Sequence, residues 1–298
     1  MWISGYLSLA LVLSSGPSEA IPTPSPAHGR VTILYDAFGG RRGLTRDWGF
    51  AALVEYAGKR VLFDTGNNAA IFAGNVRAMR VDLRHLDFVV ISHRHGDHTA
   101  GLSYLLRLNP HVKIYAPKEG FGVFGASLPA TFYRRDSTLP DSMRYFDAAP
   151  PAELKFGTPW PEANFQWVDS LTEVAPGMAV ISTVSQTPGT LELRELSLAI
   201  RTPHGLVLLV GCSHPGIETI LEAARPWGDH VQLIFGGLHL VTTPDTTITR
   251  VVTSLHDRWH VDQIAPGHCT GEPAFAALKR IFGAQYRYAG LGTVTELP

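Results

Sequence analysis

The chain is poor in cysteine and in charge, and each shortage excludes a class of protein. Only two of its 298 residues are cysteine, which excludes a disulfide-rich scaffold. Charged residues make up 17 % of the chain, its formal net charge is -1, and no long basic run occurs, which argues against binding to a nucleic-acid backbone. Neither a dinucleotide fingerprint nor a serine-nucleophile elbow is present. We therefore expect a small-molecule substrate and no nucleic-acid partner.

The apolar run at the N-terminus, Ile3–Leu13, is too short to span a bilayer as a helix, which needs about 20 residues. Ser18-Glu19-Ala20 has small residues at the spacing of a signal-peptidase site, although a basic segment before the run is missing. We predict a signal peptide over residues 1–20 and a periplasmic or secreted protein without a stable membrane anchor after cleavage. One alternative is an irregular N-terminal segment that is not a signal peptide, which would leave the protein cytoplasmic. The other is an uncleaved tail that dips into the membrane.

The remainder of the chain is expected to form one α/β domain over residues 30–298. A Pro-rich linker at 21–29 precedes it. Strand-like segments such as Arg30–Asp36 alternate with helix-like segments in two halves, which fits a layered α/β fold with its site on the loops after the strands. Residues 118–176 are rich in Pro, Gly and aromatics and show weak periodicity, so we predict an insertion or lid there.

Four metal-binding side chains directly follow a short apolar strand, in the stretch SHRHGDHTAGL. In an extended chain, residues two apart point the same way, so His93 and His95 can share one metal ion. Asp97 and His98, beyond the bend at Gly96, can face a second ion. Imidazole and carboxylate are ligands that zinc, manganese and iron accept. The pattern predicts a two-metal site; the alternative is a polar loop that happens to be rich in histidine.

SHRHGDHTAGL also matches the HxHxDH signature of the metallo-β-lactamase fold superfamily, and VLFDTG, upstream, looks like its first motif. The order continues with LLVGCSHPGIETIL, IFGGLHL and IAPGHCTG, and closes with GTVTEL. This set resembles the dihydropterin ribofuranosylaminobenzene 5′-phosphate synthase-like metallo-hydrolase subfamily. The resemblance implies an αββα sandwich, that is, two mixed β-sheets flanked by helices, with the metals at one edge of the two sheets.

The resemblance also implies roles for single residues. The two histidines of HxH would bind the first metal ion, and the Asp-His pair the second. His268, after the last strand, matches the final histidine ligand and would join the second site. Asp64 would orient the metal loop by hydrogen bonds without binding metal itself, unless it is only a turn residue at the strand end. Asp97 would also be catalytic, orienting the nucleophile or taking its proton.

The third motif of the family departs from its usual pattern. The stretch VSQTPGTLEL has no histidine, and Cys212 occupies the slot of the bridging aspartate. We expect His214 to supply the missing imidazole ligand. Cys212 is a thiolate ligand, a group supporting the ligands, or a small buried residue. A disulfide between Cys212 and Cys269, which export would favour, is the rival interpretation.

Three further side chains are candidates for substrate binding. His239 follows a predicted strand and could contact the substrate or stabilise negative charge, the alternative being a histidine packed at a strand end. Arg134 and Arg135 lie in the expected insertion, and arginine suits phosphate binding. Surface arginines without function are the alternative.

Together these features favour a metal-dependent hydrolase with two divalent ions, zinc first and manganese or iron as alternatives. It would activate a bridging water on a phosphorylated or ester-type small molecule. A di-iron oxidoreductase on the same fold would need an electron donor, and neither a flavodoxin-like extension nor a cysteine quartet is present. A non-catalytic protein that binds a metal or ligand is the third possibility.

Overall fold

The computed structural model describes residues 1, 29–119, 124–129, 137–138, 140–141, 144–157, 160, 162–186 and 192–298. Apart from Met1 and Gly29, the expected signal peptide and linker lie outside the described residues, as do Arg134 and Arg135. Within the described part of the chain, no helix is both long and apolar enough to cross a membrane.

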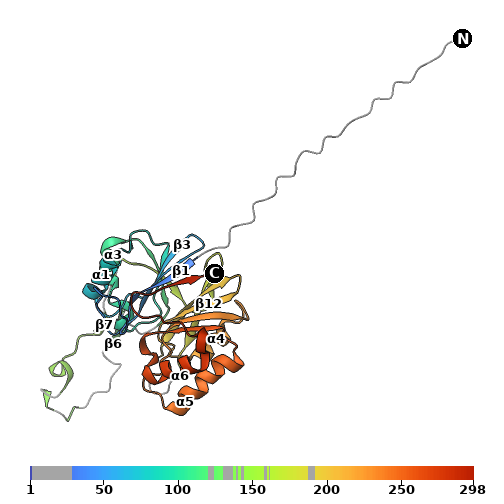
Figure 1. The fold of residues 1–298 in the computed structure, drawn as a ribbon. Helices are drawn as coiled ribbons and strands as arrows, with labels where there is room; N and C mark the ends of the chain where they lie inside the picture. The colour runs from blue at the N-terminus through green and yellow to red at the C-terminus, as the bar shows by residue number, and fades with distance from the viewer. Residues whose placement is uncertain are drawn as a thin grey trace.

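Two β-sheets pack face to face at the centre of the molecule (Figure 1). The first sheet consists, in order across it, of β15 (Val294–Leu297), β1 (Gly29–Tyr35), β2 (Ala51–Tyr56), β3 (Lys59–Phe63), β4 (Phe88–Val90), β5 (Lys113–Pro117) and β8 (Asn164–Val168). The second consists of β14 (Gln263–Pro266), β13 (Val231–Gly236), β12 (Gly205–Val210), β11 (Arg194–Thr202), β10 (Met178–Val184) and β9 (Thr172–Ala175). Both sheets are mixed, because parallel pairs such as β3·β4 and β12·β13 adjoin antiparallel ones.

Helices cover the outer face of each sheet. On the first sheet lie α1 (Ala69–Ala78) and α3 (Leu102–Leu108), and on the second α4 (Ile217–Ala224), α5 (Asp245–Thr253) and α6 (Glu272–Phe282). A single helical turn, α2 (Gly96–Thr99), begins in the histidine-rich loop. A π-helical turn, Ser254–Arg258, continues α5, and short 3₁₀ turns occur at Tyr145–Ala148, His268–Thr270 and Gly283–Gln285. The αββα sandwich that the sequence resemblance implied is confirmed.

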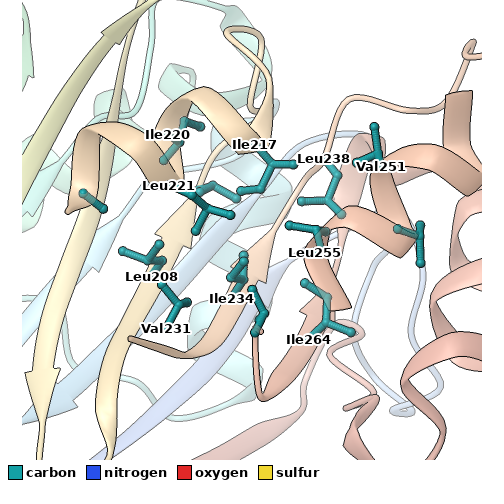
Figure 2. Packing of buried hydrophobic residues seen from close by; sticks show 14 of the residues in the cluster. Leu208, Ile217, Ile220, Leu221, Val231, Ile234, Leu238, Val251, Leu255 and Ile264 are labelled. Atoms are coloured by element: carbon teal, nitrogen blue, oxygen red, sulfur yellow. The ribbon is translucent and has the colours of Figure 1, made fainter. Parts of the chain in front are cut away.

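The central strand β12 shows why the sequence folds into layers. Its residues GLVLLV are almost continuously apolar because both faces of the strand are buried. Side chains alternate along a strand, so Val207 and Leu209 point between the sheets while Leu208 points to the helices. Figure 2 shows Leu208 beneath Ile220 and Leu221 of α4. This packing fixes the strand ends that carry the site.

The stretch expected to form an insertion is divided in the structure. β6 (Phe124–Pro129) and β7 (Glu153–Gly157) pair with each other in a separate two-stranded sheet. In contrast, β8 pairs with β5 in the first sheet and β9 pairs with β10 in the second. Residues 164–175 therefore belong to the two main sheets. The sequence does not indicate that β8 belongs to the first sheet, because β8 is an edge strand with an irregular burial pattern.

The carboxyl ends of five strands carry the residues that the sequence motifs single out. In the first sheet, Asp64 follows β3, and the histidine-rich loop follows β4. In the second sheet, the loops after β12, β13 and β14 carry Cys212, His239 and His268, respectively. Parallel strands end at the same edge of a sheet, so the topology brings these loops together.

Candidate metal centre

Side chains from these loops form two neighbouring groups, each with three potential ligands. The first cluster consists of His93, His95 and His214, and the second of Asp97, His98 and His268; within each, the ligand atoms lie within 4.8 Å of one another. All six are residues that the sequence predicts as ligands. The ligands come from distant parts of the chain, because the loop after β4 and the loop after β14 are more than 100 residues apart in the sequence.

The first cluster contains three imidazoles and no acidic ligand. Nε2 of His93 lies 3.1 Å from Nδ1 of His95, and the ring of His214 lies 4.7 and 4.9 Å from those two rings. Burial lowers the pKa of His93 well below its usual value, and desolvation together with the neighbouring His214 lowers the pKa of His95 to about 4. Neutral imidazole is the form that binds metal, so these two rings are already in the required state at neutral pH.

Glu195, a fully buried residue of β11, holds the loop that carries His214. Its carboxylate accepts hydrogen bonds from the backbone N–H groups of Cys212 (2.9 Å), Ser213 (2.7 Å) and His214 (2.9 Å), and lies 3.1 Å from Nδ1 of His214. Burial opposes its charge, but the contact with His214 and the backbone donors lower the pKa of Glu195. Sequence reasoning missed this residue, although a glutamate at the start of the apolar run ELSLAI was a usable signal.

Asp64 holds the second cluster. Its carboxylate accepts hydrogen bonds from the backbone N–H and the hydroxyl of Ser92, both at 2.7 Å, and lies 2.7 Å from Nδ1 of His98. Burial opposes a charge on His98, but the attraction of Asp64 outweighs it and raises the pKa of His98 to about 9. Because Nδ1 faces Asp64, Nε2 is the nitrogen that can bind a metal ion. Asp64 thus contacts the ring of a predicted ligand, and its role in orienting that ligand stays a prediction.

Asp36, at the end of β1, holds the loop of His268. Its carboxylate accepts hydrogen bonds from the backbone N–H of His268 at 3.0 and 3.2 Å and from that of Ala37 at 2.7 Å. Burial raises the pKa of Asp36 to about 8. Sequence reasoning did not find Asp36.

The backbone is strained at four residues of the site. Asp64, Ser213, His239 and His268 have positive φ angles between 47° and 63°, a conformation that is frequent at functional sites.

The donor set fits a pair of divalent metal ions. Both ring nitrogens of His268 are buried and have no hydrogen-bond partner among the described residues, while Nε2 lies 3.3 Å from Oδ2 of Asp97. Burial opposes ionisation of Asp97, but His268 and His98 lower its pKa, so it is a carboxylate at neutral pH. A buried imidazole without a partner, aimed at a carboxylate, is the arrangement that a bound ion would satisfy.

Cys212 lies between the two clusters, with Sγ 3.2 Å from Nε2 of His98. It forms a ligand group with His93 and His98. Cys212 and Cys269 are both buried, free thiols, so the structure does not contain the disulfide considered as an alternative. Cys212 is therefore in position to act as a thiolate ligand.

The site is bordered by exposed rings. His239 is exposed, and its ring lies 4.3 Å from that of His214. Trp48, whose side chain is 45 % exposed, packs its ring 5.1 Å from that of His268. Trp48 lies on the long loop between β1 and β2, and nothing in the local sequence marks it as part of the site.

Comparisons with known proteins agree with this architecture. A family model described as the beta-lactamase superfamily domain matches residues 59–163. A 7,8-dihydropterin-6-methyl-4-(beta-D-ribofuranosyl)-aminobenzene-5′-phosphate synthase of Methanocaldococcus jannaschii is 28 % identical over an aligned length of 232 residues, and the alignment covers 72 % of this chain and 76 % of the relative. An uncharacterized protein of the same organism is 25 % identical over an aligned length of 255 residues, and the alignment covers 81 % of this chain and 91 % of the relative.

Two solved structures have similar folds. Tm1679, described as a metal-dependent hydrolase of the beta-lactamase superfamily, is 26 % identical with a TM-score of 0.67 over 91 % of this chain and 98 % of its own. The metallo-beta-lactamase fold protein YhfI of Bacillus subtilis is 14 % identical, with a TM-score of 0.57 over 91 % of this chain and 100 % of its own, which supports the fold alone.

Proposed function

We propose that this protein, a chain of the metallo-β-lactamase fold superfamily, is a metal-dependent hydrolase that holds two divalent ions, with zinc the first choice. The observation that carries the proposal is the pair of three-ligand clusters at one edge of the sandwich, with the unpartnered ring of His268 aimed at Asp97. Similarity to a metal-dependent hydrolase of the beta-lactamase superfamily supports the reaction class.

When bound, two such ions supply a water of lowered pKa and stabilise negative charge that develops on the substrate. The protein supplies orientation and proton control. Asp64 directs Nε2 of His98 towards the ions, and Glu195 fixes the loop of His214. His98, when charged, has to release a proton before it can bind metal. Asp97, whose side chain is 19 % exposed, can orient the attacking water or accept its proton.

We propose a phosphorylated or ester-type small molecule as substrate. The name of the synthase relative suggests the phosphate, and a chain of net charge -1 without a long basic run argues against a nucleic-acid substrate. Arg134 and Arg135 remain predicted phosphate contacts. Trp48 lies beside His268 of the second cluster, and His239 lies beside His214 of the first. Both rings are exposed, so a substrate that approaches the site would meet them.

The test combines elemental analysis with a panel of phosphoester, thioester and lactam substrates. Wild-type protein is expected to contain at least two metal ions per chain and to hydrolyse at least one class. His95→Ala removes a ligand of the first cluster and should abolish metal-dependent hydrolysis, whereas His204→Ala, an exposed histidine on the turn between β11 and β12, should not. Full activity and normal metal content in His95→Ala would refute the assignment, and bound iron with no hydrolysis would favour redox chemistry.

A further inference from the structure

A third group of ligand atoms lies beside the two clusters. Sγ of Cys212, Sγ of Cys269 and a ring nitrogen of His239 lie within 4.8 Å of one another. We infer that these three side chains form a further site for one thiophilic divalent ion, such as Zn²⁺ or Cd²⁺, which adjoins the two clusters through Cys212. The inference goes beyond the proposed hydrolase, because neither Cys269 nor His239 belongs to its two ligand clusters.

The three ligands are carried by loops that hydrogen bonds tie together. The backbone N–H of Gly237 donates to the carbonyl of Gly211 at 3.1 Å, and the hydroxyl of Ser213 donates to the carbonyl of Gly237 at 2.7 Å. The backbone N–H of Val241 donates to the carbonyl of Cys269 at 3.2 Å. The loops after β12, β13 and β14 thus form one linked unit, and the three ligands are positioned before any ion arrives.

Local backbone geometry keeps space for the thiol of Cys269. A Cβ atom at Gly237 would lie 2.6 Å from Sγ of Cys269 and 2.7 Å from the carbonyl oxygen of Gly211, so a larger residue there would displace both. Two residues beyond Gly237, His239 has a positive φ of 51°, and one of its ring nitrogens lies within 4.8 Å of both cysteine Sγ atoms.

The chemistry of the three ligands differs from that of the other two clusters. Two thiolates and one imidazole form the ligand set of an open zinc site, which leaves a fourth position for water or another small ligand. The cysteines are buried, with exposed fractions of 3 % and 2 %, whereas His239 is exposed and opens the site to solvent. Among the six ligands of the two clusters only Asp97 is an anion, so two thiolates also reduce the repulsion between bound ions.

The inference is tested by counting Cd²⁺ ions per chain in the full-length protein by native mass spectrometry, together with the sulfur-to-cadmium absorption band. Wild type is expected to bind three ions. Cys269→Ser and His239→Ala should each bind two, with a weaker band in Cys269→Ser. His204→Ala, a matched exposed histidine away from the site, should still bind three. Circular dichroism checks folding, and exposed His239 gives an informative variant even if Cys269→Ser does not fold.

Two ions in the wild type, or an unchanged count in both Cys269→Ser and His239→Ala, would overturn the third site. Failure of the proposed hydrolase has a different signature. In that case His95→Ala leaves hydrolysis unchanged, or no substrate is hydrolysed at all, whereas the cadmium counts and the sulfur band still report on Cys212, Cys269 and His239.

Discussion

The first and second clusters use similar side chains but differ in their proton state. In the first, desolvation and neighbouring imidazoles keep the pKa of His93 and His95 low, with that of His95 at about 4. In the second, direct contact with Asp64 raises the pKa of His98 to about 9. His93 and His95 of the first cluster are therefore ready to bind a cation at neutral pH, whereas His98 of the second has to release a proton first. The difference arises because Asp64 contacts the ring of His98 directly, whereas desolvation and neighbouring imidazoles dominate at His93 and His95.

The largest expected effect comes from removing the only acidic ligand. Asp97→Asn should lower the turnover number by about 10²- to 10⁴-fold, because the variant can neither accept the proton of the attacking water nor bind the second ion as an anion. The assay is steady-state hydrolysis at saturating zinc, with elemental analysis of the same sample. Retention of wild-type turnover would show that the second cluster has no part in the reaction.

A pair of variants separates the clusters by their supporting carboxylates. Asp64→Asn should weaken metal binding at the second cluster by about 10- to 100-fold, and Glu195→Gln should do so at the first. The reason is that Asp64 lies against the ring of His98, whereas Glu195 holds the loop of His214. Competition with a chromophoric chelator measures the two binding steps. If both variants weakened the same step, the clusters would not be independent.

Metal-free protein should become less stable as the pH rises, and His98 should account for much of the slope. The folded-state pKa of His98 is about 9, above the value of about 6.5 expected when unfolded. Its stabilisation is therefore complete below about pH 6.5 and is lost as the pH rises through about 9, an effect on the order of 3 kcal/mol. Asp36, with its pKa raised to about 8, acts in the same direction at lower pH.

Urea unfolding in the presence of a chelator at a series of pH values measures this slope. His98→Gln should unfold more easily than wild type at pH 6 and should show a flatter dependence between pH 6.5 and pH 9. A wild-type stability that rises over this range would contradict the proton assignment of the second cluster.

The smallest effect is expected at Trp48, which packs on the second cluster only. Its loss in Trp48→Ala should weaken metal binding there by about two- to ten-fold, because an aromatic contact contributes about 0.5–1.5 kcal/mol. Binding at the first cluster should not change. The chelator competition described above measures both steps, and an equal change at the two clusters would argue for a general loss of stability instead.

The sequence predicts the ligands of both clusters better than the residues that hold their loops, because four of the six ligands lie in one short stretch. His93 and His95 share a face by strand periodicity, and both are visible in one short stretch. Asp36 and Glu195 hold loops through hydrogen bonds to backbone N–H groups, and neither residue belongs to one of the sequence motifs. Asp36 is 232 residues from His268, so only the assembled sheets bring the two together.

Some strands of the fold can be predicted from the local sequence pattern, whereas others can be assigned only from their pairing in the folded sheets. Continuous apolar runs identify the central strands, such as β12, because both of their faces are buried. The edge strand β8 lacks such a run, and only its pairing with β5 assigns it to the first sheet. The division of the chain into signal peptide, linker and domain remains a prediction.

The central claim is that two ligand clusters at the sheet edge hold two ions. A crystal structure of zinc-loaded protein with anomalous diffraction at the zinc edge tests it most directly. The account predicts one anomalous peak among His93, His95 and His214 and a second among Asp97, His98 and His268. Absence of a peak from either cluster in protein that hydrolyses its substrate would contradict the account.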